Sequence, residues 1–201
     1  MTRILFLLMF VCELAYSQSD STDSITDIKK FQAELNREYR TKGESPLEPN
    51  DFSSFKEHDF FPIDLKYRVV GKLKRTNNSL FFQMKTTTSK MSTERVFGIV
   101  TFKIEGKEFS VPVYQSQSLM QTEAYKDYLF FPFTDLTNGD ETYDGGRYID
   151  LRIPSGEDIL IDFNKAYNPY CAYSHRYSCP IVPPENRLDA KILAGTKYKK
   201  K

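Results

Sequence analysis

Short apolar runs separated by polar turn residues fill most of this chain from residue 67 onward. The runs are rich in Val, Ile, Phe and Tyr, which is typical of β-strands. No helical pattern lies between them, so we expect a mainly β fold, an antiparallel barrel or sandwich of about eight strands. Glu105 and Gly106 predict a hairpin turn between two of the runs. The predicted strands are 67–75, 80–86, 95–106, 107–116, 128–136, 147–154, 158–164 and 189–195.

One segment before the strands has helical spacing instead. Its apolar residues recur every three or four positions, which predicts an amphipathic helix packed on the main domain. Ser24, followed three positions later by Asp27, resembles a capping box at its start, and Gly43 supplies the stop. The apolar residues of this face are Ile25, Ile28, Phe31, Leu35 and Tyr39.

The N-terminus predicts export. Arg3 precedes an apolar run over 4–11, and Ala15-Tyr16-Ser17 forms a small-x-small cleavage signal. We expect a signal peptide over 1–17, a polar segment and helix over 18–44, and a single β-rich domain over 45–201, periplasmic or secreted after cleavage near Ser17. Cys12 follows Phe10 and Val11 rather than small residues, which disfavours a lipoprotein. No other apolar run is long enough to span a membrane.

The charge balance excludes a general attraction to nucleic acid. The chain of 201 residues has 28 Lys and Arg against 27 Asp and Glu, a net charge of +1. A protein that binds nucleic acid through its overall charge is strongly basic, so we expect no nucleic-acid partner. The sequence does not predict the oligomeric state.

Four stretches carry a family resemblance. They are SPL (45–47), DFFPIDLKYRV (59–69), YLFFPFTDLTNGDETYDGGRYIDL (128–151) and DFNKAYNPYCAYSHRYSCPIVPPEN (162–186). They resemble the signature blocks of an uncharacterised bacterial family, domain of unknown function 1684, from about Ser45 to Gly195. The resemblance implies a bacterial exported protein in a short form, and it implies no activity.

A hairpin over 147–164 would place two carboxylates opposite each other. If its apolar rows face the core, Asp150 lies opposite Asp162 and Tyr148 opposite Asn164. Bare opposed carboxylates repel, so a shared proton, a nearby cation such as Arg147 or a bound metal would have to relieve them. A hydrogen-bonded structural network, a metal or acid–base site, and a different register all remain open.

The loop entering this hairpin adds further polar groups. Asp135, Asn138, Glu141 and Tyr143 surround the Asn138-Gly139 turn. Oxygen ligands of this kind suit calcium or magnesium, but their spacing does not match an EF-hand loop. Ordinary turn bonds explain Asp and Asn equally well. We therefore predict no metal site and no cofactor, with a divalent cation as the alternative.

Two cysteines flank a histidine near the C-terminus. Cys171, His175 and Cys179 are spaced by four residues, which on a helix would resemble an incomplete zinc site. In an exported protein two nearby cysteines form a disulfide most simply, and this is our expectation. A metal site and free thiols, including a Cys–His nucleophile pair, are the alternatives.

The stretch around these cysteines is rich in Tyr and Asn, which suit recognition of a polar ligand as well as bonding within a long loop. We predict an exported non-enzymatic binding module for a small polar ligand or glycan. The alternatives are a hydrolase using the paired carboxylates, with or without a divalent cation, and a structural envelope protein. The predicted ligand-binding residues are Asp135, Asn138, Glu141, Tyr143, Arg147, Asp150, Asp162, Asn164, Tyr167, Asn168, Tyr173 and His175.

Overall fold

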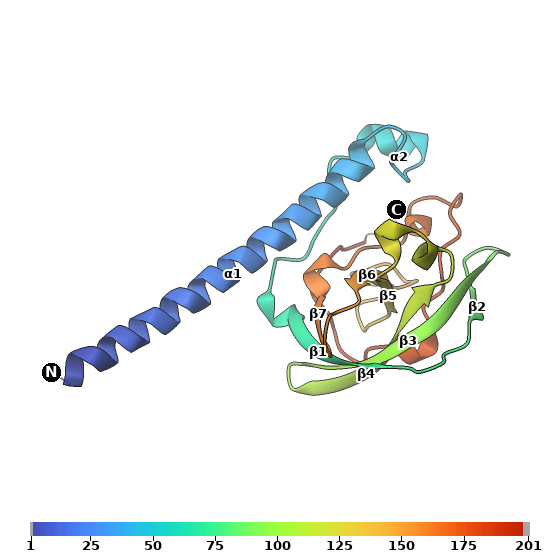
Figure 1. Ribbon diagram of the computed structural model, residues 1–201. Helices are drawn as coiled ribbons and strands as arrows, with labels where there is room; N and C mark the ends of the chain where they lie inside the picture. The colour runs from blue at the N-terminus through green and yellow to red at the C-terminus, as the bar shows by residue number, and fades with distance from the viewer. Residues whose placement is uncertain (1, 199–201) are drawn as a thin grey trace.

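A computed structural model describes residues 2–198, with side chains from Ser21 onward. In this part of the chain seven strands form one antiparallel sheet that curls into a nearly closed barrel (Figure 1). The strands are β1 (Arg68–Arg75), β2 (Phe82–Lys85), β3 (Met91–Ile104), β4 (Lys107–Ser116), β5 (Tyr128–Phe133), β6 (Arg147–Arg152) and β7 (Asp158–Asp162). The order is β6-β5-β4-β3-β1-β7, and β2 pairs with β3. The expected mainly β antiparallel fold is confirmed.

The hairpin of β3 and β4 is the longest ladder of the sheet. Its register runs from Glu94 opposite Ser116 to Ile104 opposite Lys107, with a bulge between Val96 and Gly98. Glu105 and Gly106 both have positive φ, 49° and 81°, which is the backbone of the tight turn predicted there. This hairpin therefore forms where the sequence places it.

The predicted strand over 189–195 is wrong. Within the described residues this segment makes no ladder, and only a single bridge joins nearby Thr196 to Phe60. The carbonyl oxygens of Ile192 and Ala194 accept hydrogen bonds from the Arg147 guanidinium instead. Because a side chain satisfies its backbone, the segment needs no neighbouring strand.

The predicted hairpin of β6 and β7 is also wrong. β6 pairs with β5 and β7 pairs with β1, so these two strands are the ends of the sheet order. They lie beside each other at the seam of the barrel without a ladder in the described residues. The barrel therefore closes by side-chain packing along this seam.

The barrel interior is apolar and aromatic. The ring of Phe163 packs against Phe102, Phe131 and Phe133, with centroid separations of 5.3–6.1 Å. These rings come from three segments, β3, β5 and the turn after β7, so they pack different parts of the sheet against one another across the core.

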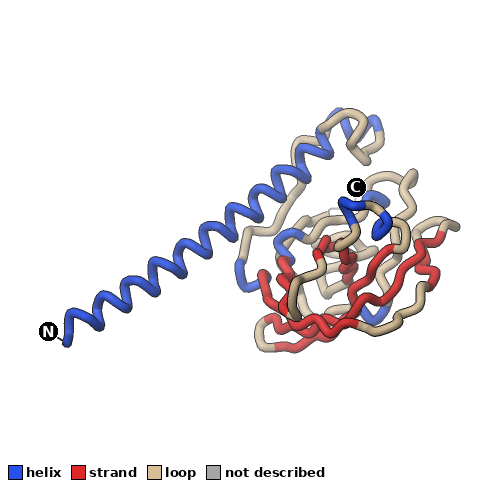
Figure 2. Tube along the Cα trace, in the orientation of Figure 1, coloured by secondary structure: helices blue, strands red, loops and turns tan. Residues whose placement is uncertain are grey.

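A helix on the outside of the barrel completes the fold (Figure 2). Helix α1 spans Thr2–Arg40 and is followed by the short helix α2 (Pro49–Ser54). Ile28, Leu35 and Tyr39 are buried, which confirms the predicted apolar face. The helix already includes the residues before Ser24, so the capping box predicted at Ser24 is wrong. Among the described residues, no helix is long and apolar enough for a membrane span.

Over residues 2–198, six single 3-10 turns lie in the segments between and after these elements. They are Leu65–Tyr67, Leu119–Gln121, Glu123–Tyr125, Phe163–Lys165, Tyr170–Ala172 and Pro184–Asn186. The predicted signal peptide falls on residues 1–17, whose side chains lie outside the described part of the chain, so the cleavage stays a prediction.

Candidate functional site

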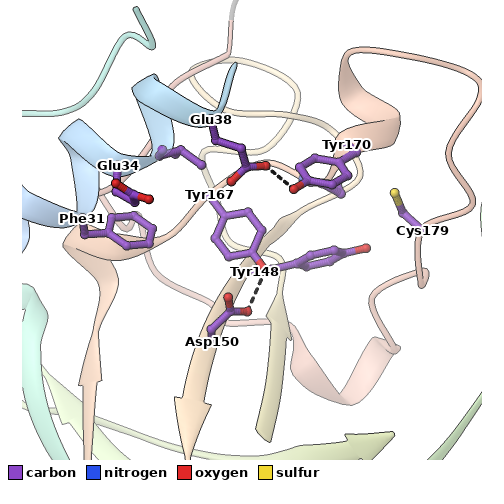
Figure 3. Close-up of a pocket in the computed structure, with 10 residues that line it drawn as sticks. Phe31, Glu34, Glu38, Tyr148, Asp150, Tyr167, Tyr170 and Cys179 are labelled. Carbon is purple, nitrogen blue, oxygen red and sulfur yellow. Dashed lines mark hydrogen bonds between the residues drawn. The ribbon is translucent and has the colours of Figure 1, made fainter. Parts of the chain in front are cut away.

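A pocket of about 310 Å³ lies between helix α1, strand β6 and the loop after β7 (Figure 3). We call this loop, residues 163–180, the Tyr-rich loop, and we call the pocket the tyrosine pocket. Its walls are mainly aromatic and aliphatic, with three carboxylates among them. The lining residues are Phe31, Glu34, Leu35, Glu38, Tyr148, Asp150, Tyr167, Pro169, Tyr170 and Cys179.

Each wall of the tyrosine pocket follows from a regular spacing. Phe31, Glu34, Leu35 and Glu38 are three, four and seven positions apart, so α1 presents them on one face. Tyr148 and Asp150 are two positions apart on β6 and therefore point to the same side of the sheet. The Tyr-rich loop is fixed to β6 because the backbones of Tyr148 and Tyr167 exchange two hydrogen bonds. The pocket is thus built from elements that hold its shape.

Asp150 is the polar centre of the strand wall. Its Oδ1 accepts hydrogen bonds from the phenol groups of Tyr128, at 2.8 Å, and Tyr167, at 2.7 Å. Burial raises the pKa of both phenols far above the ordinary value, and the nearby Asp150 charge raises it further. Both tyrosines therefore remain neutral donors at physiological pH.

Glu38 is the corresponding hydrogen-bond acceptor on the helix wall. Its Oε1 accepts a hydrogen bond from the phenol of Tyr170 (Figure 3). Glu34, next to it on α1, forms an ion pair with Arg37 at 2.7 Å. Among the described residues, neither Glu38 nor Asp150 has an ion-pair partner. Among the residues with described side chains, the hydrogen bonds to these two carboxylates thus come from neutral phenols alone.

Asp162, predicted to lie opposite Asp150, has a structural role instead. Its side chain is 5% exposed and accepts from the Arg68 guanidinium at 2.6 Å. Its other oxygen accepts from the backbone and side-chain amides of Asn164. Asp150 and Asp162 are not paired across a ladder, although both line a hollow of about 180 Å³ at the seam between β6 and β7. The opposed-carboxylate pair is therefore wrong.

Asp135 and Arg147 form a fully buried ion pair. Their side chains are 0% exposed, and Arg147 Nη2 lies 3.3 Å from Asp135 Oδ1. Asp135 also accepts from Thr137 and from the backbone of Ile192. Arg147 lies over the Phe133 ring. This network ties the C-terminal segment to the barrel and faces no solvent.

The predicted loop residues bond mainly within their own loop. Asn138 accepts from the Asp135 backbone and donates to Thr142 and to the Tyr143 carbonyl. Glu141 lies 3.6 Å from the Lys191 ammonium group. These contacts hold the turn and do not reach the tyrosine pocket.

The two asparagines of the Tyr-rich loop also serve the fold. Asn164 exchanges hydrogen bonds with the backbone of Asp64, which fixes the segment before β1. Asn168 donates to the Tyr173 hydroxyl and to the Lys197 carbonyl, while its Oδ1 has no partner among the described atoms. The structure thus divides the predicted binding residues, with Asp150 and Tyr167 alone in the tyrosine pocket.

The two cysteines are free thiols in contact with each other. Cys179 Sγ accepts from the backbone amide of Cys171 at 3.2 Å. Hydrogen bonds from the Cys179 thiol, Thr87 and Tyr143 lower the pKa of Cys171 to about 7. The structure has both cysteines as free thiols, so the predicted disulfide stays a prediction.

His175 and Tyr173 lie in a second hollow. This hollow of about 400 Å³ also takes in Cys171, Tyr143 and Asp144. His175 is exposed there. Among the described residues no cluster of His, Cys, Asp and Glu has the form of a metal site.

Sequence reasoning missed the helix wall. Phe31 and Leu35 were assigned to packing, and Glu34 and Glu38 were not singled out. The available signal was two glutamates beside an apolar stripe that already contained an aromatic residue. His58 was also missed. It lies among the rings of Tyr39, Phe55 and Phe60, and burial lowers its pKa to about 4.

Comparisons with known proteins agree on the fold and leave the activity open. A family model described as "Protein of unknown function (DUF1684)" matches residues 53–197. The chain is also similar to the solution NMR structure of an uncharacterized protein from Haloarcula marismortui. The TM-score is 0.69 and the identity 28%, with 90% of this chain and 97% of that chain covered. No curated protein matches.

Proposed function

The chain belongs to the DUF1684 family of proteins of unknown function, and we propose that it is a non-enzymatic binding module that takes a small polar ligand in the tyrosine pocket. The observation that carries this proposal is the pocket itself. A concave site of about 310 Å³ with apolar and aromatic walls and a few placed polar groups is the usual form of a small-molecule site.

The hydrogen bonding in the pocket favours binding over catalysis. A hydrolase of the kind considered from sequence needs two carboxylates free to act on one substrate, or a general base beside a nucleophile. Asp162 is occupied by Arg68 and Asn164. The raised pKa of Tyr167 keeps its phenol protonated at neutral pH, so the phenol is not available as a general base. The polar groups of the pocket are therefore suited to holding a ligand in place.

The proposed site is compatible with export. Every residue that lines the tyrosine pocket follows the predicted cleavage point near Ser17, so a processed chain keeps both walls. We propose that the module acts outside the cytoplasm after this cleavage.

The test is a ligand screen by NMR on the isotope-labelled protein. The screen would contain small polar compounds: neutral alcohols and sugars, amines, and carboxylic acids. We expect at least one compound to shift the amide signals of Tyr148, Asp150 and Tyr167 together. A screen in which no compound shifts these signals would contradict the proposed function.

A pocket-filling variant provides the specificity control. Glu38→Trp would place a large ring in the pocket, so we expect it to abolish the ligand-induced shifts. Lys29→Trp adds the same ring to an exposed position of the same helix, outside the pocket, and should leave the shifts unchanged. Shifts that persist in Glu38→Trp would place the ligand elsewhere.

A further inference from the structure

We infer that the ligand of the tyrosine pocket is a small protonated aliphatic amine, held through Glu38 and Asp150. This inference rests on the proposed function and gives its ligand a chemical class. It follows from the charges that line the pocket, from the acceptor atoms left open there, and from the aromatic rings around them.

The charges in the pocket are all of one sign. Its described lining contains three carboxylates and no Lys, Arg or His. Glu34 is neutralised by Arg37, which leaves Glu38 and Asp150 without a cation. An anionic ligand would be repelled at this site, whereas a cationic one would be attracted.

The basic residues near Asp150 are committed elsewhere. Arg68, Arg152 and Lys165 line the hollow at the seam of the barrel, which Asp150 also lines. Arg68 pairs with Asp162, Arg152 with Asp127, and Lys165 with Asp27, at 2.6–2.7 Å. These cations therefore satisfy other carboxylates, and the Asp150 charge stays unmatched.

The open acceptor atoms indicate what kind of cation fits. Tyr128 and Tyr167 both bond Asp150 Oδ1, and Tyr170 bonds Glu38 Oε1. The second oxygen of each carboxylate receives no hydrogen bond from the described residues. A primary ammonium group carries three donors and would use these oxygens.

The walls suit the rest of such a molecule. Aromatic rings attract cations through their faces and also cover methylene groups. The rings of Tyr148 and Tyr167 stand edge to face, with centroids 6.0 Å apart, and Phe31 and Tyr170 add further ring surface. An aliphatic amine combines the charge that the carboxylates require with the short apolar chain that these walls cover.

The two carboxylates lie on different walls. Glu38 comes from α1 and Asp150 from β6, and the Tyr167 ring lies between them in Figure 3. A linear diamine carries two ammonium groups, so it offers one cation for each of the two carboxylates. Putrescine, a four-carbon diamine, is the probe that we would use.

The experiment is isothermal titration calorimetry of putrescine and of the neutral butanediol of the same chain length. We expect putrescine to bind at least about tenfold more tightly, because only the diamine gains charge-assisted hydrogen bonds. Its affinity should also fall as the salt concentration rises. Equal affinity for the diol, with NMR shifts at Tyr148 and Asp150, would overturn the amine inference and leave the proposed function standing.

Two isosteric variants locate the bound amine. We expect Glu38→Gln and Asp150→Asn each to weaken putrescine binding by about tenfold, since each removes one charge without changing shape. Glu123→Gln is the control, because Glu123 is an exposed carboxylate outside the pocket and its loss should have no effect. If putrescine bound all four proteins equally, or failed to bind while other compounds occupied the pocket, the inference would be wrong.

Discussion

The two aspartates Asp135 and Asp150 were predicted as parts of one site, yet their surroundings differ completely. Asp135 is buried, paired with Arg147 and bonded by a hydroxyl and a backbone amide. Asp150 is exposed toward a pocket and bonded only by two phenols. The first carboxylate is balanced by a charge within the protein, and the second is not.

This difference separates a carboxylate that serves the fold from one that is available to a ligand. A buried charge without a partner is strongly destabilising, so a buried carboxylate is normally found paired with a cation. A charge at the wall of a pocket can stay unpaired because water solvates it until a ligand arrives. Burial and charge pairing therefore distinguish these two kinds of carboxylate, which the sequence composition does not. Variants at each position can test this distinction.

The largest effect is expected from Arg147→Met. This change leaves the Asp135 charge without a partner and removes the donor to the carbonyls of Ile192 and Ala194. Breaking one half of a buried ion pair costs about 3–5 kcal/mol of unfolding free energy. Urea denaturation measures it. Arg152→Met is the matched control on the same strand, where an exposed ion pair with Asp127 should contribute at most about 1 kcal/mol.

If Arg147→Met does not fold, a second variant keeps the comparison testable. Replacing Asp135 with Leu in the same chain removes the unpaired charge and should recover part of the lost stability. Equal stability of Arg147→Met and Arg152→Met would show that the buried pair is not what holds the C-terminal segment.

A smaller effect is expected from pH through His58, a buried titratable group with no charged partner. Burial lowers its folded-state pKa from 6.5 to about 4. Between these pH values the unfolded chain binds a proton that the folded chain does not, so the unfolding free energy falls as the pH drops. The loss should approach about 3 kcal/mol near pH 4.

The measurement for His58 is urea denaturation across this pH range, compared with His58→Phe. The variant keeps a ring among Tyr39, Phe55 and Phe60 and removes the titration. The difference between the two proteins isolates His58 from the carboxylates that titrate in the same range. Identical pH dependence in both proteins would mean that His58 does not contribute.

The smallest stability effect is expected from Asp150→Asn. The amide oxygen still accepts from Tyr128 and Tyr167, and no ion pair is lost, so the unfolding free energy should change by no more than about 0.5 kcal/mol. Thermal and urea unfolding both measure it. A loss of more than about 2 kcal/mol would place Asp150 with Asp135 as a residue of the fold.

The strands could be predicted from sequence because their signals are local. Apolar runs and the Glu105-Gly106 turn place β3 and β4 to within a few residues. Strand pairing is different, since β6 and β7 are joined by a short turn yet pair with β5 and β1. The pairing partners of β6 and β7 depend on closure of the whole barrel, and no feature of residues 147–164 alone predicts them.

The candidate site was predicted only on its β side. The Tyr-rich loop and Asp150 stood out by composition and by a carboxylate in a strand. In the sequence, Glu38 resembles any solvent-exposed helix residue, because its role depends on which face of α1 packs against the Tyr-rich loop. The roles of Arg147 and Asp162 could not be separated from that of Asp150 either, since burial distinguishes them and composition does not.

The helix wall of the tyrosine pocket lies outside residues 53–197, the part of the chain that the family model matches. In terms of inheritance, four of the ten residues that line the pocket are encoded in a segment that need not change together with the barrel. Relatives with the same strands and the same Tyr-rich loop can thus differ at positions equivalent to Glu34 and Glu38. Ligand preference can then diverge among chains whose shared region looks alike.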